Sequence, residues 1–236
     1  MKNNLLPGQM RFISFKKKKK KKVKDVFKAY LTVGAERTPV EEYPIISSWM
    51  VPTELGKVKI IPFSKWKDVG RHIGEYYICF YCEDDKFLAV LNNPKKYIKL
   101  FRRAKGIIGF DYSVYSDMPV YKQKSQMGDN LSLTFYYGML NIKVIPNIRF
   151  GIEATCEDFL KAIPKRSTIA IGSYGCVHSK EEQERYRHFL KHILFELDPK
   201  NVIVYGAMPV EIFEPYLDKY TFIQSDAVTG HDKEEV

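Results

Sequence analysis

Two charged side chains stand directly after apolar runs of the chain, where parallel-sheet proteins place their chemistry. Asp111 follows Gly106–Phe110, and Arg149 follows Ile142–Ile148. A carboxylate in that position can act as a general base, as a metal ligand or as an acceptor for a substrate hydroxyl, and a guanidinium offers a planar fork for phosphate or carboxylate. The plainer alternatives are that Asp111 caps the following turn and that Arg149 forms an internal salt bridge with Asp111 or Glu153.

Two further carboxylates follow another apolar run. Asp84 and Asp85 come shortly after Tyr76–Tyr81, and Asp84 is a second candidate for acid–base catalysis. If this run neighbours the one that precedes Asp111, two or three carboxylates converge, which is the arrangement that a divalent cation needs. A divalent cation is therefore the candidate cofactor. The alternative is that the two acidic residues compensate the dipole of the helix that follows them.

A glycine-flanked segment adds candidate ligand contacts. Ser173, Tyr174 and Gly175 precede a helix, and glycines let backbone N–H groups approach an anion. The segment matches neither a P-loop nor a dinucleotide fingerprint. His178 stands at the entrance of that helix and could act as a base, although a lone histidine there is more often a capping or surface residue. Tyr205, at the end of another apolar run, completes a set of side chains that suits a phosphorylated ligand.

The elements that must position these residues are short apolar runs separated by helical stretches, a rhythm that indicates parallel βα units. The predicted strands are Val58–Phe63, Tyr76–Tyr81, Gly106–Phe110, Ile142–Ile148, Ser167–Ile171, Val202–Tyr205 and Thr221–Gln224, with Tyr43–Trp49 as an eighth. We therefore predict an α/β fold with a mainly parallel sheet of about seven or eight strands, barrel-like in the manner of a TIM barrel. An open doubly wound sheet is the alternative.

The positive charge of the chain is concentrated near its start. The 236 residues carry a formal net charge of +10, and seven consecutive lysines supply most of it: Lys16, Lys17, Lys18, Lys19, Lys20, Lys21 and Lys22. Such a run is usually a solvated, disordered segment, and the alternative is an arm that binds nucleic acid. We expect a flexible lysine-rich segment over residues 1–42, a single α/β domain over 43–228 and a flexible tail over 229–236.

The thiols and the hydropathy pattern restrict the cellular setting. Cys79 and Cys82 form a C-x-x-C within a predicted strand, where residues three apart point to opposite faces, so we expect no zinc site. The chain contains no apolar run of 18 or more residues, and its first residues lack a secretory signal, so we expect neither a membrane span nor secretion. These features predict a cytoplasmic protein with reduced thiols.

Several segments resemble a family of uncharacterised proteins that are carried by phages, plasmids and other mobile elements and are known only as a domain of unknown function. The segments are Ile60–Lys65, Asn92–Tyr97, Phe110–Pro119, Ile142–Arg149, Ile169–Cys176 and Val202–Gly206. Members of that family usually have a bulky aromatic residue, often Trp, after the position of Arg149, and this chain has Phe150. The resemblance implies a mobile-element setting and supports the fold prediction, but it supplies no reaction. The lysine run is not a feature of the family.

Two functional hypotheses follow from these observations. The first is an enzyme that acts on a phosphorylated ligand, a nucleotide or a nucleic-acid end, with Asp111 as the base and Arg149 as the anion clamp. The second is a non-catalytic regulatory protein that binds nucleic acid or a host protein, because the lysine run and the 16 tyrosines could contact phosphates and bases. We further predict that Asp111 and Arg149 lie at the same end of the sheet and face a shared cavity.

Overall fold

The computed structural model of the protein describes residues 25–174 and 176–225. The strands are β1 (Ile60–Pro62), β2 (Tyr77–Cys79), β3 (Gly106–Ile108), β4 (Val144–Ile145), β5 (Thr168–Gly172), β6 (Asn201–Tyr205) and β7 (Thr221–Gln224). The α-helices are α1 (Asp84–Asn92), α2 (Pro94–Arg103), α3 (Val120–Met139), α4 (Cys156–Lys161), α5 (Lys180–Leu197) and α6 (Val210–Phe213). The 3₁₀ helices are η1 (Ala29–Thr32), η2 (Ser48–Met50), η3 (Phe63–Glu75), η4 (Glu153–Thr155) and η5 (Glu214–Tyr216).

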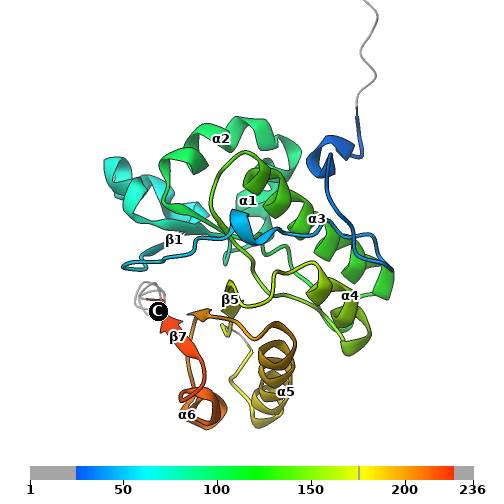
Figure 1. Ribbon diagram of the computed structural model, residues 1–236, viewed down its shortest axis with the longest axis vertical. Helices are drawn as coiled ribbons and strands as arrows, with labels where there is room; N and C mark the ends of the chain where they lie inside the picture. The colour runs from blue at the N-terminus through cyan, green and yellow to red at the C-terminus, as the bar shows by residue number, and fades with distance from the viewer. Residues whose placement is uncertain (1–24, 175, 226–236) are drawn as a thin grey trace, which may run out of the picture.

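The strands pair in parallel and follow one another in chain order (Figure 1). One sheet has the order β1-β2-β3-β4 and the other the order β5-β6-β7. The sheets meet just after β4, where the Ile148 amide donates to the Ala170 carbonyl (2.8 Å) and the Ala170 amide donates to the Pro146 carbonyl (2.9 Å). The ladder of β4 is short because Pro146 has no N–H to donate. The prediction of mainly parallel strands joined by helices is confirmed.

The prediction of a closed barrel is wrong. Among the described residues β1 and β7 do not pair with each other, so each is an edge strand. The doubly wound alternative does not fit either, because such folds reverse their strand order and this array follows the chain. The predicted eighth strand, Tyr43–Trp49, is also wrong: it holds one antiparallel bridge, between Arg37 and Pro44, and then turns into η2. Pro44 cannot donate to a ladder.

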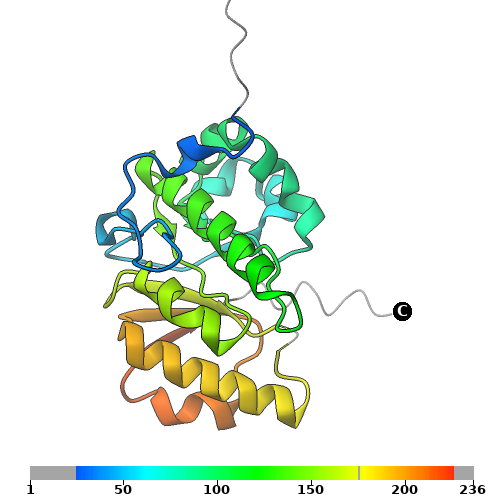
Figure 2. The same ribbon diagram turned by 90° about the vertical axis from the view of Figure 1, so that its right-hand side faces the viewer.

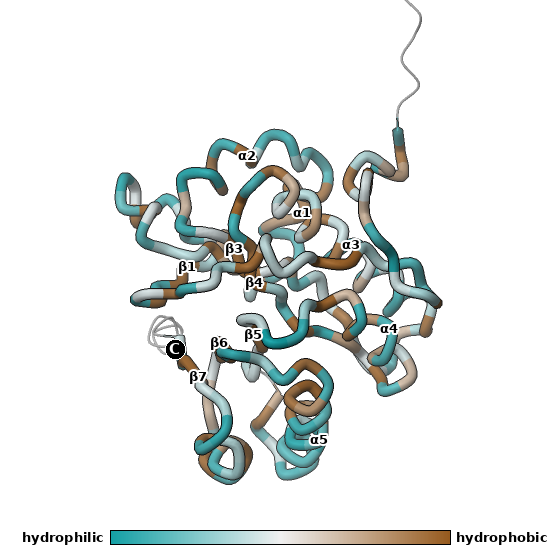
Figure 3. The backbone as a smooth tube through the Cα atoms, in the orientation of Figure 1, coloured by the Kyte–Doolittle hydropathy of each residue, from teal (hydrophilic) through white to brown (hydrophobic). Residues whose placement is uncertain are grey.

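Two layers of apolar side chains hold the array together. Successive residues of a strand point to opposite faces, so Ile78 of β2 packs with the helices while Tyr77 and Cys79 join an inner cluster. The inner cluster takes at least one side chain from every strand, for example Ile60 of β1 and Ala170 of β5. The sheets therefore curve around an inner core. Figure 3, in which the backbone is coloured by residue hydropathy, shows hydrophobic residues at β3 and β4.

The helices cover the outer side of the curved array. Figures 1 and 2 show α1, α2 and α3 against the half that holds β1–β4, and α5 and α6 against the half that holds β5–β7, with α4 between α3 and α5. A capping box begins α5: the Ser179 Oγ accepts from the Glu182 amide (3.1 Å), and Glu182 Oε2 accepts from the Ser179 amide (2.9 Å). This box fixes the first turn of α5, which forms one wall of the cleft described below.

The chain packs against this framework before residue 43. Leu31 and Thr38 are buried, and Thr38 Oγ1 donates to Asp158 Oδ2 (2.5 Å), just ahead of the turn that leads to Tyr43. Packed structure is therefore present inside the stretch for which the sequence predicts flexibility. The other predicted boundaries stay predictions, because residues 1–24, with the lysine run, and 226–236 lie outside the described residues. In the described part of the chain, no helix combines the length and the hydropathy that crossing a membrane requires.

Candidate functional site

Three side chains meet at the carboxyl ends of β3 and β4. Asp111 follows β3 and is only 9% exposed, while Asn147 and Arg149 follow β4. The Asn147 side-chain amide donates to Asp111 Oδ1 (2.8 Å), and Arg149 Nε lies 3.7 Å from the same oxygen. Asp111 and Arg149 thus lie at the same end of the sheet, as their positions after consecutive parallel strands predict.

Two tyrosines extend this cluster to neighbouring strand ends. The Tyr81 hydroxyl, from the segment after β2, donates to Asn147 Oδ1 (2.8 Å), so the Asn147 side chain links Tyr81 to Asp111. The Tyr81 ring stacks on Tyr205 at the end of β6, with centroids 4.5 Å apart. The ends of β2, β3, β4 and β6 are therefore tied into one network behind Arg149.

Burial and the ion pair act in opposite directions on Asp111. Burial raises its pKa, which the Arg149 charge and the hydrogen bond from Asn147 partly offset. The Asp111 carboxylate in turn raises the pKa of Arg149, so the guanidinium stays charged despite its partial burial. The side chain of Arg149 keeps 26% of its surface exposed, against 10% for Asp111. Arg149 therefore faces solvent, and Asp111 stands behind it.

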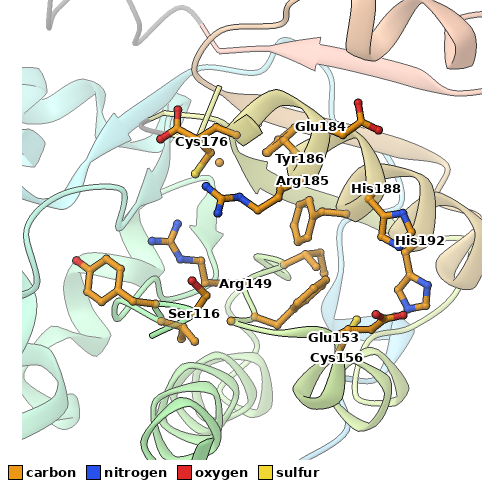
Figure 4. A pocket seen from close by; sticks show the side chains of 18 of the residues that line it. Ser116, Arg149, Glu153, Cys156, Cys176, Glu184, Arg185, Tyr186, His188 and His192 are labelled. Atoms are coloured by element: carbon orange, nitrogen blue, oxygen red, sulfur yellow. The ribbon is translucent and has the colours of Figure 1, made fainter. Parts of the chain in front are cut away.

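Arg149 opens onto a cleft of about 790 Å³ between the carboxyl ends of β4 and β5 and one face of α5. The lining includes Arg149, Phe150, Arg185, Tyr186 and Phe189 but not Asp111, so the two charged groups do not both line this cleft as predicted. Figure 4 shows the guanidinium groups of Arg149 and Arg185 at the same end of the cleft, near Cys176. A carboxylate, Glu153, and two imidazoles, His188 and His192, stand at the other end. Two guanidinium groups facing one cavity can bind a phosphate or a carboxylate.

The other predicted site residues lie at several places. Tyr174 lines the cleft, but Ser173 is buried and donates to the Ala207 carbonyl (2.6 Å). His178 is exposed and outside the lining, and its amide donates to Glu182 Oε2 (2.9 Å). Asp84 accepts from the amide and the hydroxyl of Ser113 (3.2 Å each). Gly175 and Lys16–Lys22 lie outside the described residues.

The convergence of carboxylates that would suit a divalent cation is not found. Asp84 is bound to Ser113, and Asp85 is exposed beside Lys86 (3.7 Å). Over residues 25–174 and 176–225, no group of three or more His, Cys, Asp or Glu side chains is placed to hold a metal ion. The four cysteines, Cys79, Cys82, Cys156 and Cys176, are free thiols.

Sequence reasoning missed the wall that α5 contributes. Arg185, Tyr186, Phe189 and His192 recur at three- and four-residue spacing, which places them on one face of the helix. The apolar members indicate a buried stripe, but Phe189 is only partly buried and lines the cleft. The mixture of guanidinium, phenol and imidazole within an apolar stripe is the signal that could have identified this wall.

Comparison with known proteins places the chain among phage-encoded relatives. A family model described as "Domain of unknown function (DUF4417)" matches residues 43–225. The chain is 25% identical over 129 residues to the "Gene 1 protein" of Mycobacterium phage L5, covering 55% of this chain and 56% of the relative. It is 24% identical over 129 residues to the "Gene 1 protein" of Mycobacterium phage D29, covering 55% of this chain and 48% of the relative. The matches therefore span about half the length of these curated relatives. No solved structure matches the chain.

Proposed function

The chain belongs to the family of the domain of unknown function (DUF4417), whose description names no reaction, so we propose a function from its own side chains. The cleft binds a phosphorylated ligand, a nucleotide or a nucleic-acid end, and acts on it as an enzyme. The observation that carries this proposal is the pair of guanidinium groups, Arg149 and Arg185, at one end of the cleft. Phosphate accepts the paired N–H donors of arginine in a fixed geometry, so this end of the cleft is the phosphate site.

The network behind Arg149 supports this role by holding the guanidinium in place. Asp111 restricts Arg149 from one side, Asn147 orients Asp111, and Tyr81 restricts Asn147. An arginine that is already oriented loses less conformational entropy when it binds an anion. Asp111 retains some exposure, and burial raises its pKa above the ordinary value of a carboxyl, which favours a role in general acid–base catalysis.

Arg185 gives the cleaner test of anion binding, because no buried carboxylate depends on it. We expect Arg185→Gln to weaken the binding of inorganic pyrophosphate by about tenfold or more, since a hydrogen bond to a charged group contributes about 1.5–3 kcal/mol. Isothermal titration calorimetry on the full chain measures this loss. Arg187→Gln is the matched control: Arg187 lies on the same helix, pairs with Glu184 and is not part of the cleft lining. Equal affinity in the two variants would refute the assignment.

Turnover is tested separately from binding. The full chain is incubated with nucleotides and with 5′-phosphorylated oligonucleotides, and the products are separated by chromatography. An enzyme that uses Asp111 as its acid or base should lose about 100-fold or more of its rate in Asp111→Asn when the rate is measured at saturating ligand. A chain that binds these ligands and releases no product is a binding protein.

The second candidate function is such a binding protein, a regulator that engages nucleic acid or a host protein without turnover. The observation that favours it is the exposure of two aromatic side chains of the cleft lining, Tyr115 (54%) and Tyr174 (65%). Aromatic side chains near guanidinium groups can stack on the bases of single strands without sequence preference. We expect short oligonucleotides to quench tyrosine fluorescence, and Tyr115→Ala to reduce this quenching; an unchanged signal would argue against the contact.

We also place the protein in the cytoplasm. Its four cysteines are free, and Cys79 and Cys156 are buried, a state that a reducing compartment preserves. Fractionation of cells that produce the chain should recover it with cytoplasmic markers, and recovery with the membrane or secreted fraction would contradict this placement.

A further inference from the structure

The cleft has an aromatic wall that a phosphate alone would not use. The rings of Phe150 and Phe189 lie with centroids 4.7 Å apart and their planes tilted by 48°, and the Tyr186 ring lies 5.5 Å from that of Phe189 with a tilt of 44°. Phe150 and Phe189 are partly buried hydrophobic residues, and both line the cavity. Because one ring comes from the loop after β4 and the other from α5, the wall spans the two sides of the cleft. A planar ligand can stack on one of these rings while the other, inclined ring packs against it.

At the guanidinium end, one polar atom lacks a partner. Tyr186 is 5% exposed, it lines the cleft, and its hydroxyl has no hydrogen-bond partner among the described residues. Burial raises the pKa of Tyr186, with a further rise from Cys176 and a reduction from Arg149, so the hydroxyl lies within electrostatic reach of both groups. A buried hydroxyl without a partner costs free energy that a ligand oxygen would recover.

At the opposite end, a second polar atom lacks a partner. His192 Nε2 is buried and makes no hydrogen bond within the described ranges, although His192 lines the cleft. Figure 4 places His192 and Glu153 at the end away from the two arginines. A ring nitrogen and a carboxylate together offer a hydrogen-bond donor and acceptors, which is what the polar edge of a nucleobase requires.

Resting on the proposed phosphate site of the same cleft, we infer that the ligand is a nucleoside monophosphate unit. Its phosphate lies at Arg149, Arg185 and the Tyr186 hydroxyl, its base stacks on one of the tilted rings of Phe150 and Phe189 and packs against the other, and the edge of the base points toward His192. Inorganic phosphate would leave the aromatic wall and His192 unused, and a sugar phosphate has no flat face to stack. A nucleoside monophosphate matches the sequence of cationic, aromatic and polar surfaces along the cavity. A volume of about 790 Å³ lies within the range of sites for small ligands.

The test compares ligands that add one part of the nucleotide at a time. Inorganic phosphate, ribose 5-phosphate and the four ribonucleoside 5′-monophosphates are titrated into the full chain by calorimetry. We expect at least one nucleoside monophosphate to bind about tenfold or more tightly than ribose 5-phosphate, because stacking of one base on an aromatic ring is worth about that factor. A 5′-phosphorylated dinucleotide is the next ligand: tighter binding than the monophosphate identifies a strand end as the source of the unit, and weaker binding identifies a free nucleotide.

Two variants isolate the base from the phosphate. Phe189→Leu keeps an apolar side chain and removes the aromatic face, so it should abolish the tenfold advantage of the nucleotide and leave phosphate affinity unchanged. Phe150→Leu should have the same effect from the loop side. It replaces Phe189→Leu as the test if Phe189→Leu lowers the melting temperature strongly. Phe195→Leu is the matched control, since Phe195 lies on the same helix, is 80% exposed and is not part of the cleft lining. We expect it to change neither affinity.

The outcomes separate this inference from the function on which it rests. Nucleoside monophosphates that bind no tighter than ribose 5-phosphate, while phosphate binding still depends on Arg185, would overturn the base site and leave the phosphate site standing. Variants at Phe189 and Phe150 that lose phosphate and nucleotide affinity equally would also overturn it. A chain that binds neither phosphate nor nucleotide would overturn the proposed function itself.

Discussion

The ion pair of Asp111 and Arg149 combines two opposing electrostatic effects within one short distance. Burial favours the neutral form of the Asp111 carboxyl, whereas the guanidinium 3.7 Å away and the Asn147 amide favour the carboxylate. Burial has the larger effect, so the pKa of Asp111 lies above its ordinary value of 3.8. The folded state therefore binds the proton of Asp111 more tightly than the unfolded state does.

This difference predicts a pH dependence of stability. Below about pH 3.8 Asp111 is protonated in both states, and as the pH rises through its raised folded pKa the folded state must give up a proton that it holds tightly. The free energy of unfolding of the wild type should then fall relative to that of Asp111→Asn, with a slope of at most about 1.4 kcal/mol per pH unit. Urea unfolding of both proteins at a series of pH values measures it. A wild type that gains relative stability over this window would show that the ion pair outweighs burial.

At the residue scale, the sequence predicts where the site lies better than it predicts which residues form it. Asp111 and Arg149 could be predicted because each directly follows a strand, and parallel strands present their carboxyl ends together. Ser173 also follows a strand, yet it faces Ala207 and is buried, because which side chains of a strand-end loop reach solvent depends on tertiary packing. For Arg185 and Phe189 the helix pattern shows only that they share a mixed polar and aromatic face; which cavity that face borders depends on tertiary packing.

At the element scale, the close approach of β3 and the segment after β4 depends on a glycine. A Cβ at Gly109 would lie 2.8 Å from the backbone nitrogen of Asn147 and 3.1 Å from Thr134 Oγ1. Gly109→Ala should therefore push this segment away and cost about 1–3 kcal/mol of stability, the usual range for an overpacked core. Because Asn147 also orients Asp111, the variant should lose pyrophosphate affinity as well. Thermal unfolding and calorimetry measure the two effects.

A second glycine in the same structure provides the control. Gly128 lies within α3, where a Cβ would meet Tyr43 at an ordinary contact distance of 3.5 Å. Alanine has the higher helix propensity, so Gly128→Ala should stabilise the protein by about 0.5–1 kcal/mol. Destabilisation by Gly128→Ala of the same size as by Gly109→Ala would show that the proximity of Asn147 is not the cause.

The start of α5 is the other element-scale feature that can be tested. Ser179→Ala removes the side-chain acceptor for the Glu182 amide, and the loss of such a cap costs about 1 kcal/mol. Since Arg185 and Tyr186 lie within two turns of this end, fraying should also weaken pyrophosphate binding slightly. Ser125→Ala is the matched control, because Ser125 is exposed within α3 and is not a helix cap. Chemical denaturation should distinguish the two variants, and equal stabilities would contradict a stabilising cap.

The strands and their order could be predicted because the signal is local. A buried strand such as Thr168–Gly172 is apolar along its length, and the helix that follows it requires a parallel crossover. Tyr43–Trp49 has similar composition but folds differently: Tyr43, Ile46 and Met50 are buried at three- and four-residue spacing, and Pro44 interrupts any ladder. Closure of a barrel is not a local property. It depends on whether β1 and β7 can pair, and β7 has exposed residues at both ends.

At the scale of the whole molecule, two regions could bind polyanions, and they differ in their number of positive charges and in the salt dependence expected of binding. The cleft holds two guanidinium groups at a fixed place, whereas Lys16–Lys22 and Lys24 carry eight of the positive charges within nine residues. Lysine–phosphate contacts release counterions, so affinity for duplex DNA that depends on this run falls steeply as salt concentration rises. Binding of a mononucleotide in the cleft involves few phosphates and should depend on salt only weakly.

Deletion of residues 1–24 should therefore separate the two regions. If the lysine run is a nucleic-acid arm, the shortened chain should lose affinity for duplex DNA, and the slope of log affinity against log salt should decrease by about 0.9 for each lysine–phosphate contact removed. A full-length chain with serine in place of Lys16–Lys22 should behave like the deletion, which excludes an effect of length. Fluorescence anisotropy at several salt concentrations measures the slope, and a slope that the deletion leaves unchanged would rule out the arm. Mononucleotide affinity should be the same in all three chains, because the guanidinium groups, the aromatic wall and the unpartnered atoms of the cleft all lie between Tyr81 and Tyr205.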